Sequence, residues 1–115
     1  MAYDEHLADR MRGIIAALGG ADEVKMMGGL CFMRDGRMSC GVIGERAMIR
    51  LGKDAAAEAL KKPGVEQMEI GGGRIANAFV TLLPELVDDE AALSHWIARG
   101  VGFADALPPK VQRRR

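Results

Sequence analysis

The two cysteines are the residues that sequence places best for redox chemistry. Cys31 and Cys40 lie in two apolar runs joined by Asp35-Gly36, a dipeptide typical of a two-residue β-hairpin turn. Counting outward from such a turn places Cys31 directly opposite Cys40, in a pair whose side chains lie close together. This register predicts a candidate redox pair, although two reduced core thiols are the ordinary state of a cytosolic protein. A register shift of one residue would separate the two thiols.

Metal-binding and nucleophilic residues are scarce. The chain has two histidines, His6 and His95, and no CxxC or HxxxH spacing, so the sequence predicts no metal site. Ser94 directly precedes His95, but neighbours on a helix point in different directions and do not form a nucleophile–base pair. We therefore expect no catalytic residue, no cofactor and no enzymatic activity.

The glycine clusters fit turns better than phosphate-binding loops. Gly71-Gly72-Gly73 leads into a strand-like run, whereas a phosphate loop requires the N-terminus of a following helix. Gly28-Gly29 lies between two strand-like runs and predicts a tight turn or a bulge. We interpret both clusters as structural.

The elements that must position these residues alternate in a simple order. Apolar residues at helical spacing predict a first helix over about 3–18 and a last helix that follows Asp88-Asp89-Glu90. Between them we expect strands within 23–51, a short helix over 55–62 capped by Asp54, and strands over 65–70 and 75–83. The order predicts a two-layer α+β domain with an antiparallel sheet. Its expected limits are residues 1–107, followed by a basic, disordered tail over 108–115.

The balance of charges and the length of the apolar runs limit the classes of function that the chain can have. The chain has 115 residues, with 16 basic side chains balanced by 16 acidic ones, which excludes a strongly basic nucleic-acid binder. The tail could still make modest, salt-sensitive phosphate contacts through four cations: Lys110, Arg113, Arg114 and Arg115. No apolar run approaches the roughly 20 residues of a membrane helix, and the N-terminus lacks a signal-like pattern. We expect a cytoplasmic protein without membrane contact.

Methionine is unusually frequent, with eight residues in the chain. Filling of the core is the simplest role for them. The alternative is an adaptable surface for a protein partner, because the unbranched thioether side chain repacks readily.

Short motifs along most of the chain resemble the TfoX/Sxy N-terminal domain family. Lys25-Met26-Met27-Gly28-Gly29 precedes a strand and the turn Asp35-Gly36-Arg37-Met38, and the likeness returns in Met48-Ile49-Arg50-Leu51 and Leu93-Ser94-His95-Trp96. It covers about residues 3–107, although the usual family form has Phe where Met27 stands. The motif residues are Lys25, Met26, Gly28, Gly29, Asp35, Gly36 and Trp96.

The resemblance carries most of the functional expectation. The family is named after bacterial regulators of genetic competence, which assist transcription of DNA-uptake genes and have a second helical domain that we do not expect here. It implies a non-enzymatic regulatory module that acts through a protein partner, such as a transcription regulator or the transcription machinery. The family's secretion-chaperone-like fold suggests a homodimer by analogy. The alternatives are a chaperone-like dimer that binds peptides or proteins, and a thiol switch at Cys31 and Cys40.

Overall fold

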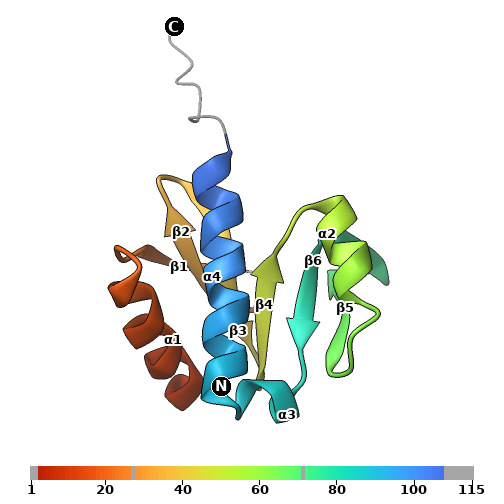
Figure 1. Ribbon diagram of the computed structural model, residues 1–115, viewed down its shortest axis with the longest axis horizontal. Coiled ribbons are helices and arrows are strands. Elements are labelled where there is room, and N and C mark those ends of the chain that lie inside the picture. Colours follow the sequence, from red (N-terminus) through yellow and green to blue (C-terminus); the bar gives the residue numbers. More distant parts are fainter. Residues whose placement is uncertain (1–2, 27, 71, 108–115) are drawn as a thin grey trace, which may run out of the picture.

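A computed structural model describes residues 3–26, 28–70 and 72–107. The elements, in chain order, are α1 (Glu5–Ala17), β1 (Asp22–Met26), β2 (Gly29–Arg34), β3 (Arg37–Ile43), β4 (Arg46–Arg50), α2 (Lys53–Ala59), β5 (Val65–Ile70), β6 (Arg74–Leu82), α3 (Pro84–Val87) and α4 (Glu90–Ala106). The strands form one antiparallel sheet in the order β1-β2-β3-β4-β6-β5 (Figure 1). The expected helix–meander–helix–strand-pair–helix order is therefore confirmed.

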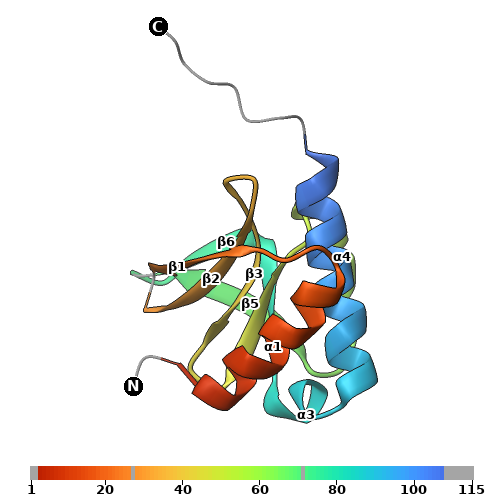
Figure 2. The ribbon, with the colours of Figure 1, turned by 90° about the vertical axis from the view of Figure 1, so that its left-hand side faces the viewer.

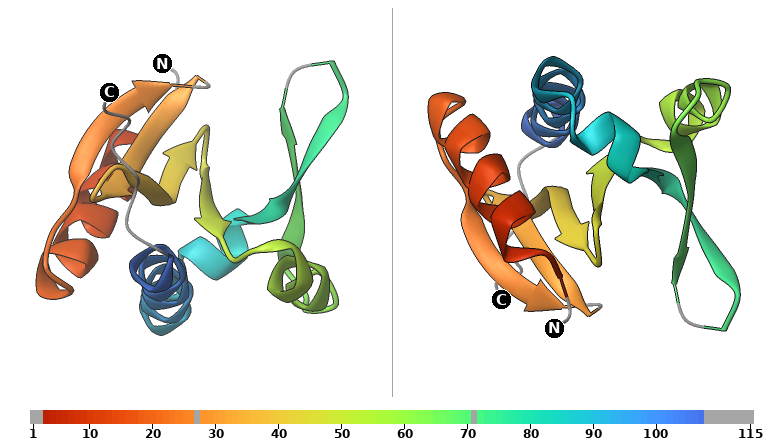
Figure 3. Two further views of the ribbon diagram at one scale, coloured as in Figure 1. Left: turned by 90° about the horizontal axis from the view of Figure 1, so that it is seen from above. Right: turned by 90° about the horizontal axis from the view of Figure 1, so that it is seen from below.

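The helices lie on one side of this sheet. Helix α4 runs along β3 and β4, with α1 beside it and α2 against β6 (Figures 1 and 2). The β1–β2 and β5–β6 hairpins curve away from the helices (Figure 3). The fold is thus the predicted two-layer α+β arrangement, with one face of the sheet covered by helices.

Turn and cap chemistry explains where the elements begin. Asp35 and Gly36 both have positive φ, 52° and 77°, as the predicted two-residue turn requires. Asp89 caps α4, because its carboxylate accepts from the backbone N–H of Ala92 at 3.1 Å. The prediction of Asp54 as the cap of α2 is wrong, since the helix begins at Lys53 and Gly52 holds the N-cap position.

A β-bulge in β3 overturns the predicted cysteine register. The turn-proximal pairs are as expected, but Ser39 is an extra residue on β3, so Phe32 pairs with Cys40 and Cys31 pairs with Gly41. Side chains alternate between the two faces of a sheet, so Cys31 and Cys40 now lie on opposite faces. The predicted opposed pair does not exist in this register.

The bulge is stabilised by its own serine and faces helix α4. The buried Ser39 hydroxyl donates to the carbonyl of Phe32 at 2.9 Å, which satisfies a polar group in the interior. The Ser39 carbonyl points at Gly100, where an added Cβ would come within 2.5 Å of its oxygen. Gly100 therefore permits the close approach of α4 to the sheet. An added Cβ on Gly102 would meet nothing within 4 Å, so the close approach to the sheet concerns Gly100 alone of these two glycines.

Candidate functional site

Methionine side chains gather on the face of the sheet opposite the helices. Met48 alternates along β4 with Ala47 and Ile49, which belong to the helix-covered core, so Met48 points to the opposite side. Four buried residues form a cluster there: Cys31, Met38, Met48 and Met68. Partly buried residues pack against it: Met33, Ile43, Ile70, Ala76 and Phe79. We call these nine residues the methionine face.

The four cluster residues of the methionine face are buried although, within the described residues, no helix lies over them. Met48 is 0% exposed and Met68 is 2% exposed. The curvature of the sheet explains this burial, because the β1–β2 and β5–β6 hairpins rise on either side of the central strands (Figure 3). Long, flexible methionine side chains then fill the space between the hairpins.

Exposed apolar side chains extend this face to the edge of the sheet. Val24 is 42% exposed and lies opposite Cys31, and Met26 is 36% exposed and lies opposite Gly29. Two charged residues on the same side, Arg46 and Glu66, form an ion pair at 2.9 Å and so compensate each other. The edge of the extended face therefore carries apolar Val24 and Met26 beside exposed Asp22, and the charges of Arg46 and Glu66 on this side are paired.

The family-motif residues shape the turns and the core. Gly28 has φ 76°, and a Cβ on Gly29 would overlap the carbonyl oxygen of Val42, so both positions require glycine. Trp96 is buried in the covered core beneath the Arg99 guanidinium, whose carbon lies 4.8 Å from the ring centroid. Lys25 and Met26 lie on the exposed strand β1, and Met27 lies outside the described residues.

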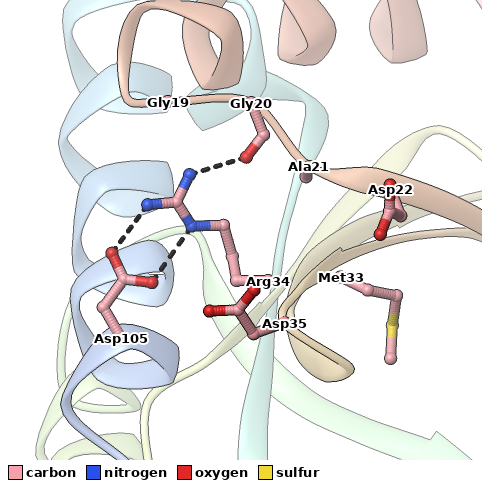
Figure 4. A pocket seen from close by; sticks show the side chains of 8 residues that line it. All are labelled: Gly19, Gly20, Ala21, Asp22, Met33, Arg34, Asp35 and Asp105. Atoms are coloured by element: carbon pink, nitrogen blue, oxygen red, sulfur yellow. Dashed lines mark hydrogen bonds and ion pairs between the residues drawn. The ribbon is translucent and has the colours of Figure 1, made fainter.

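A polar hollow of about 380 Å³ lies where three elements meet, between the α1–β1 connection, the β2–β3 turn and the end of α4. Arg34 donates from Nε and Nη2 to the Asp105 carboxylate, at 3.1 and 2.7 Å, and from Nη1 to the Gly20 carbonyl at 2.6 Å (Figure 4). These bonds lower the pKa of Asp105 and raise that of Arg34. All three guanidinium nitrogens of Arg34 are used in these hydrogen bonds. Arg34 therefore ties β2 to α4 and to the α1–β1 connection and is not available to bind a ligand.

Both thiols sit in environments that disfavour the thiolate. Cys31 and Cys40 are free and buried. Burial raises the pKa of Cys40 to about 12 and also raises the pKa of Cys31. Thiol–disulfide exchange requires a thiolate, so neither residue is activated for it. The structure separates the candidate redox pair by face, and the hydrogen bond from the Ser39 hydroxyl to Cys40 Sγ does not offset the effect of burial on the pKa of Cys40.

Other predictions fall partly or wholly outside the described residues. The basic tail, with Lys110, Arg113, Arg114 and Arg115, lies outside them.

Within 3–26, 28–70 and 72–107, no group of three or more His, Cys, Asp or Glu residues is arranged to hold a metal ion. The same part of the chain contains no helix with the length and apolar character needed to cross a membrane.

The convergence of the methionines on one face was not predicted from the sequence. The available signal was the alternation along β4, where Met48 stands between Ala47 and Ile49. The bulge at Ser39 hides the same signal in β3, because it changes which residues share a face.

Comparison with known families agrees with this architecture. Residues 14–104 match the model of the TfoX N-terminal domain. No match was found among curated proteins or among solved structures. The matched segment begins within α1 and ends within α4, so it contains the whole sheet and the methionine face. The chain belongs to the TfoX N-terminal domain family.

Proposed function

We propose that this protein is a non-enzymatic, competence-regulator-like module that binds a protein of the transcription machinery through its methionine face. Membership of the TfoX N-terminal domain family supports the regulatory class. The choice of binding surface is supported by one observation. The methionine face lies opposite the helices and continues into exposed Val24 and Met26. Apolar surface of this kind at a sheet edge is typical of an interaction site.

The chemistry of this surface favours an apolar protein segment over nucleic acid. Nucleic-acid binding depends on cations that neutralise phosphates. Arg46 on this side is already paired with Glu66 at 2.9 Å. Methionine side chains adapt their shape at little energetic cost, which suits an amphipathic helix or extended segment of a partner.

The proposal is tested by affinity capture from lysate of the source cells, with and without nuclease. Met33→Glu and Ile70→Glu place a charge on half-buried positions at two ends of the methionine face. Leu18→Glu is the control, because Leu18 is a large apolar residue that is 37% exposed and lies outside this face. Thermal unfolding of each variant confirms that it remains folded.

We expect a protein partner that survives nuclease, is retained by L18E, and is captured at least tenfold less by M33E and I70E. Removal of residues 108–115 should leave capture unchanged. The proposal is wrong if folded M33E and I70E capture the partner as well as the unaltered chain does. Capture that disappears with nuclease or with the tail would likewise contradict it.

A further inference from the structure

We propose that β1 pairs edge to edge with β1 of a second copy of this chain, antiparallel and centred on Val24, in a two-fold symmetric dimer. This inference goes beyond the proposed function, because it concerns backbone pairing and charge at the sheet edge, although Val24 belongs to both surfaces. It specifies both the surface and the register of self-association.

Strand β1 is an open edge. It pairs with β2 on one side only, and all five of its residues are exposed. The strand crosses the side of the molecule that faces the viewer in Figure 2. An edge strand leaves the N–H and C=O groups of alternate residues without ladder partners, and such edges readily accept another strand.

The charges of β1 are self-complementary in one register. When Val24 faces Val24 of the second copy, Glu23 faces Lys25 of that copy, and its Glu23 faces Lys25 here. Shifting the register by two residues places Glu23 against Glu23 or Lys25 against Lys25, which is unfavourable. Shifts of one residue would place the two helix layers on opposite sides of the joint sheet. The Val24-centred register is therefore selected among those that keep the helices together.

The side chains of Glu23 and Lys25 are placed so that they can form these ion pairs with a second copy. Glu23 accepts from Arg12 of α1 at 2.6 and 3.0 Å, which holds its carboxylate in place at the edge. Lys25 makes no ion pair or side-chain hydrogen bond within the described part of the chain. Each Lys25 could join the Arg12–Glu23 pair of the other copy, forming a three-membered network on either side of the two-fold axis.

The opposite edge of the sheet lacks these properties. Strand β5 carries two acidic residues and no basic one, and Glu66 is already paired with Arg46. Its register with β6 is irregular between Gln67 and Glu69. Bulged edges resist the addition of another strand. Self-association is therefore assigned to β1 and not to β5.

Pairing at β1 also removes exposed apolar surface. Val24, the most exposed of the large hydrophobic residues described, would pack against Val24 of the second copy. Because the helix layers lie on one side of the joint sheet, the two methionine faces would lie side by side on the other. The dimer would therefore present one extended apolar surface.

Sedimentation equilibrium over a range of protein concentrations tests the inference. We expect a dimer for the unaltered chain and a dissociation constant raised about tenfold by E23K or by K25E, because each places like charges opposite each other twice. Mixing E23K with K25E should restore a dimer, since each copy then matches the charges of the other. K62E, the same charge change at an exposed residue far along the chain, should leave the dimer unchanged.

Three outcomes would overturn this inference. One is a monomer at every concentration. Another is a dimer that neither charge reversal weakens while K62E behaves identically, which would place self-association elsewhere. The third is a failure of the E23K and K25E mixture to associate although both variants remain folded by circular dichroism. The mixture keeps the test valid even if loss of the Arg12–Glu23 pair lowers the stability of E23K.

Discussion

The two faces of the sheet bury different types of side chain. On the helix-covered face the buried core contains Leu, Ile, Val and Trp96 and a single methionine, Met11. On the opposite face three of the four buried cluster residues are methionines. A face that meets fixed helices favours rigid, branched side chains that fit closely, whereas a face that must cover itself favours flexible ones. The difference indicates that one face specifies the fold while the other is free to adapt.

Neighbouring residues of β4 offer the strongest test of this contrast. Ile49 and Met48 are both 0% exposed but point to opposite faces. We expect Ile49→Ala to lower the free energy of unfolding by about 3–4 kcal/mol, because the cavity would lie against α4 and cannot collapse. Met48→Ala should cost about 2 kcal/mol, because neighbouring methionines can move into the space. Urea denaturation of both variants measures the difference, and equal losses would contradict the contrast.

Two glycines of α4 test the close fit of the covered face. Gly100→Ala would place Cβ within 2.5 Å of the Ser39 carbonyl oxygen, so we expect a loss of about 2 kcal/mol. Gly102→Ala meets nothing within 4 Å and should stabilise the helix by about 0.5–1 kcal/mol. Thermal unfolding reports both changes. Stabilisation of the protein by Gly100→Ala would show that α4 does not approach the bulge closely.

The reactivity of the two thiols also tests the difference between the two faces, because Cys40 lies in the covered core and Cys31 lies on the methionine face. Native Cys40, within the covered core, should react with a disulfide reagent more slowly than Cys31, and both should react far faster after unfolding. The pKa of Cys40 is raised to about 12 in the folded chain, whereas an unfolded thiol ionises near 8.5. Its contribution to stability is therefore fully present below about pH 8.5 and is lost as pH rises toward 12.

Denaturation between pH 8 and 11 measures that contribution. The free energy of unfolding should fall with a slope of up to about 1.4 kcal/mol per pH unit that is absent in Cys40→Ala. Groups that titrate in both proteins cancel in the comparison. Identical slopes in the two proteins would show that Cys40 is not desolvated.

Local chemistry made much of the fold predictable. Asp35-Gly36 determines its turn through two residues with positive φ, and Asp89 begins α4 with its own carboxylate. These signals act within a few residues, so one sequence is enough to find them. The cap of α2 was missed because the backbone N–H groups of Leu51 and Gly52 both donate to the Ala78 carbonyl, a contact distant in sequence. That contact lets the helix begin directly after Gly52.

The candidate site was less predictable because it is made by non-local pairing. The bulge at Ser39 packs against Gly100, which lies about sixty residues later in the chain. One extra residue was enough to separate Cys31 from Cys40. Convergence of Met48 and Met68 likewise depends on the order of strands, in which β6 separates β4 from β5. Composition revealed the abundance of methionine but not its location on one face.

Photoreactive methionine tests the central claim most directly, because the residues that distinguish the two faces become the probes. The protein would be produced with the diazirine analogue of methionine, irradiated in the source cells and mapped by mass spectrometry. We predict that partner peptides attach at Met26 and Met33, whereas Met11, buried in the covered core, forms only intramolecular links. A co-purifying partner that links to neither Met26 nor Met33 would contradict the assignment of the methionine face as the binding surface.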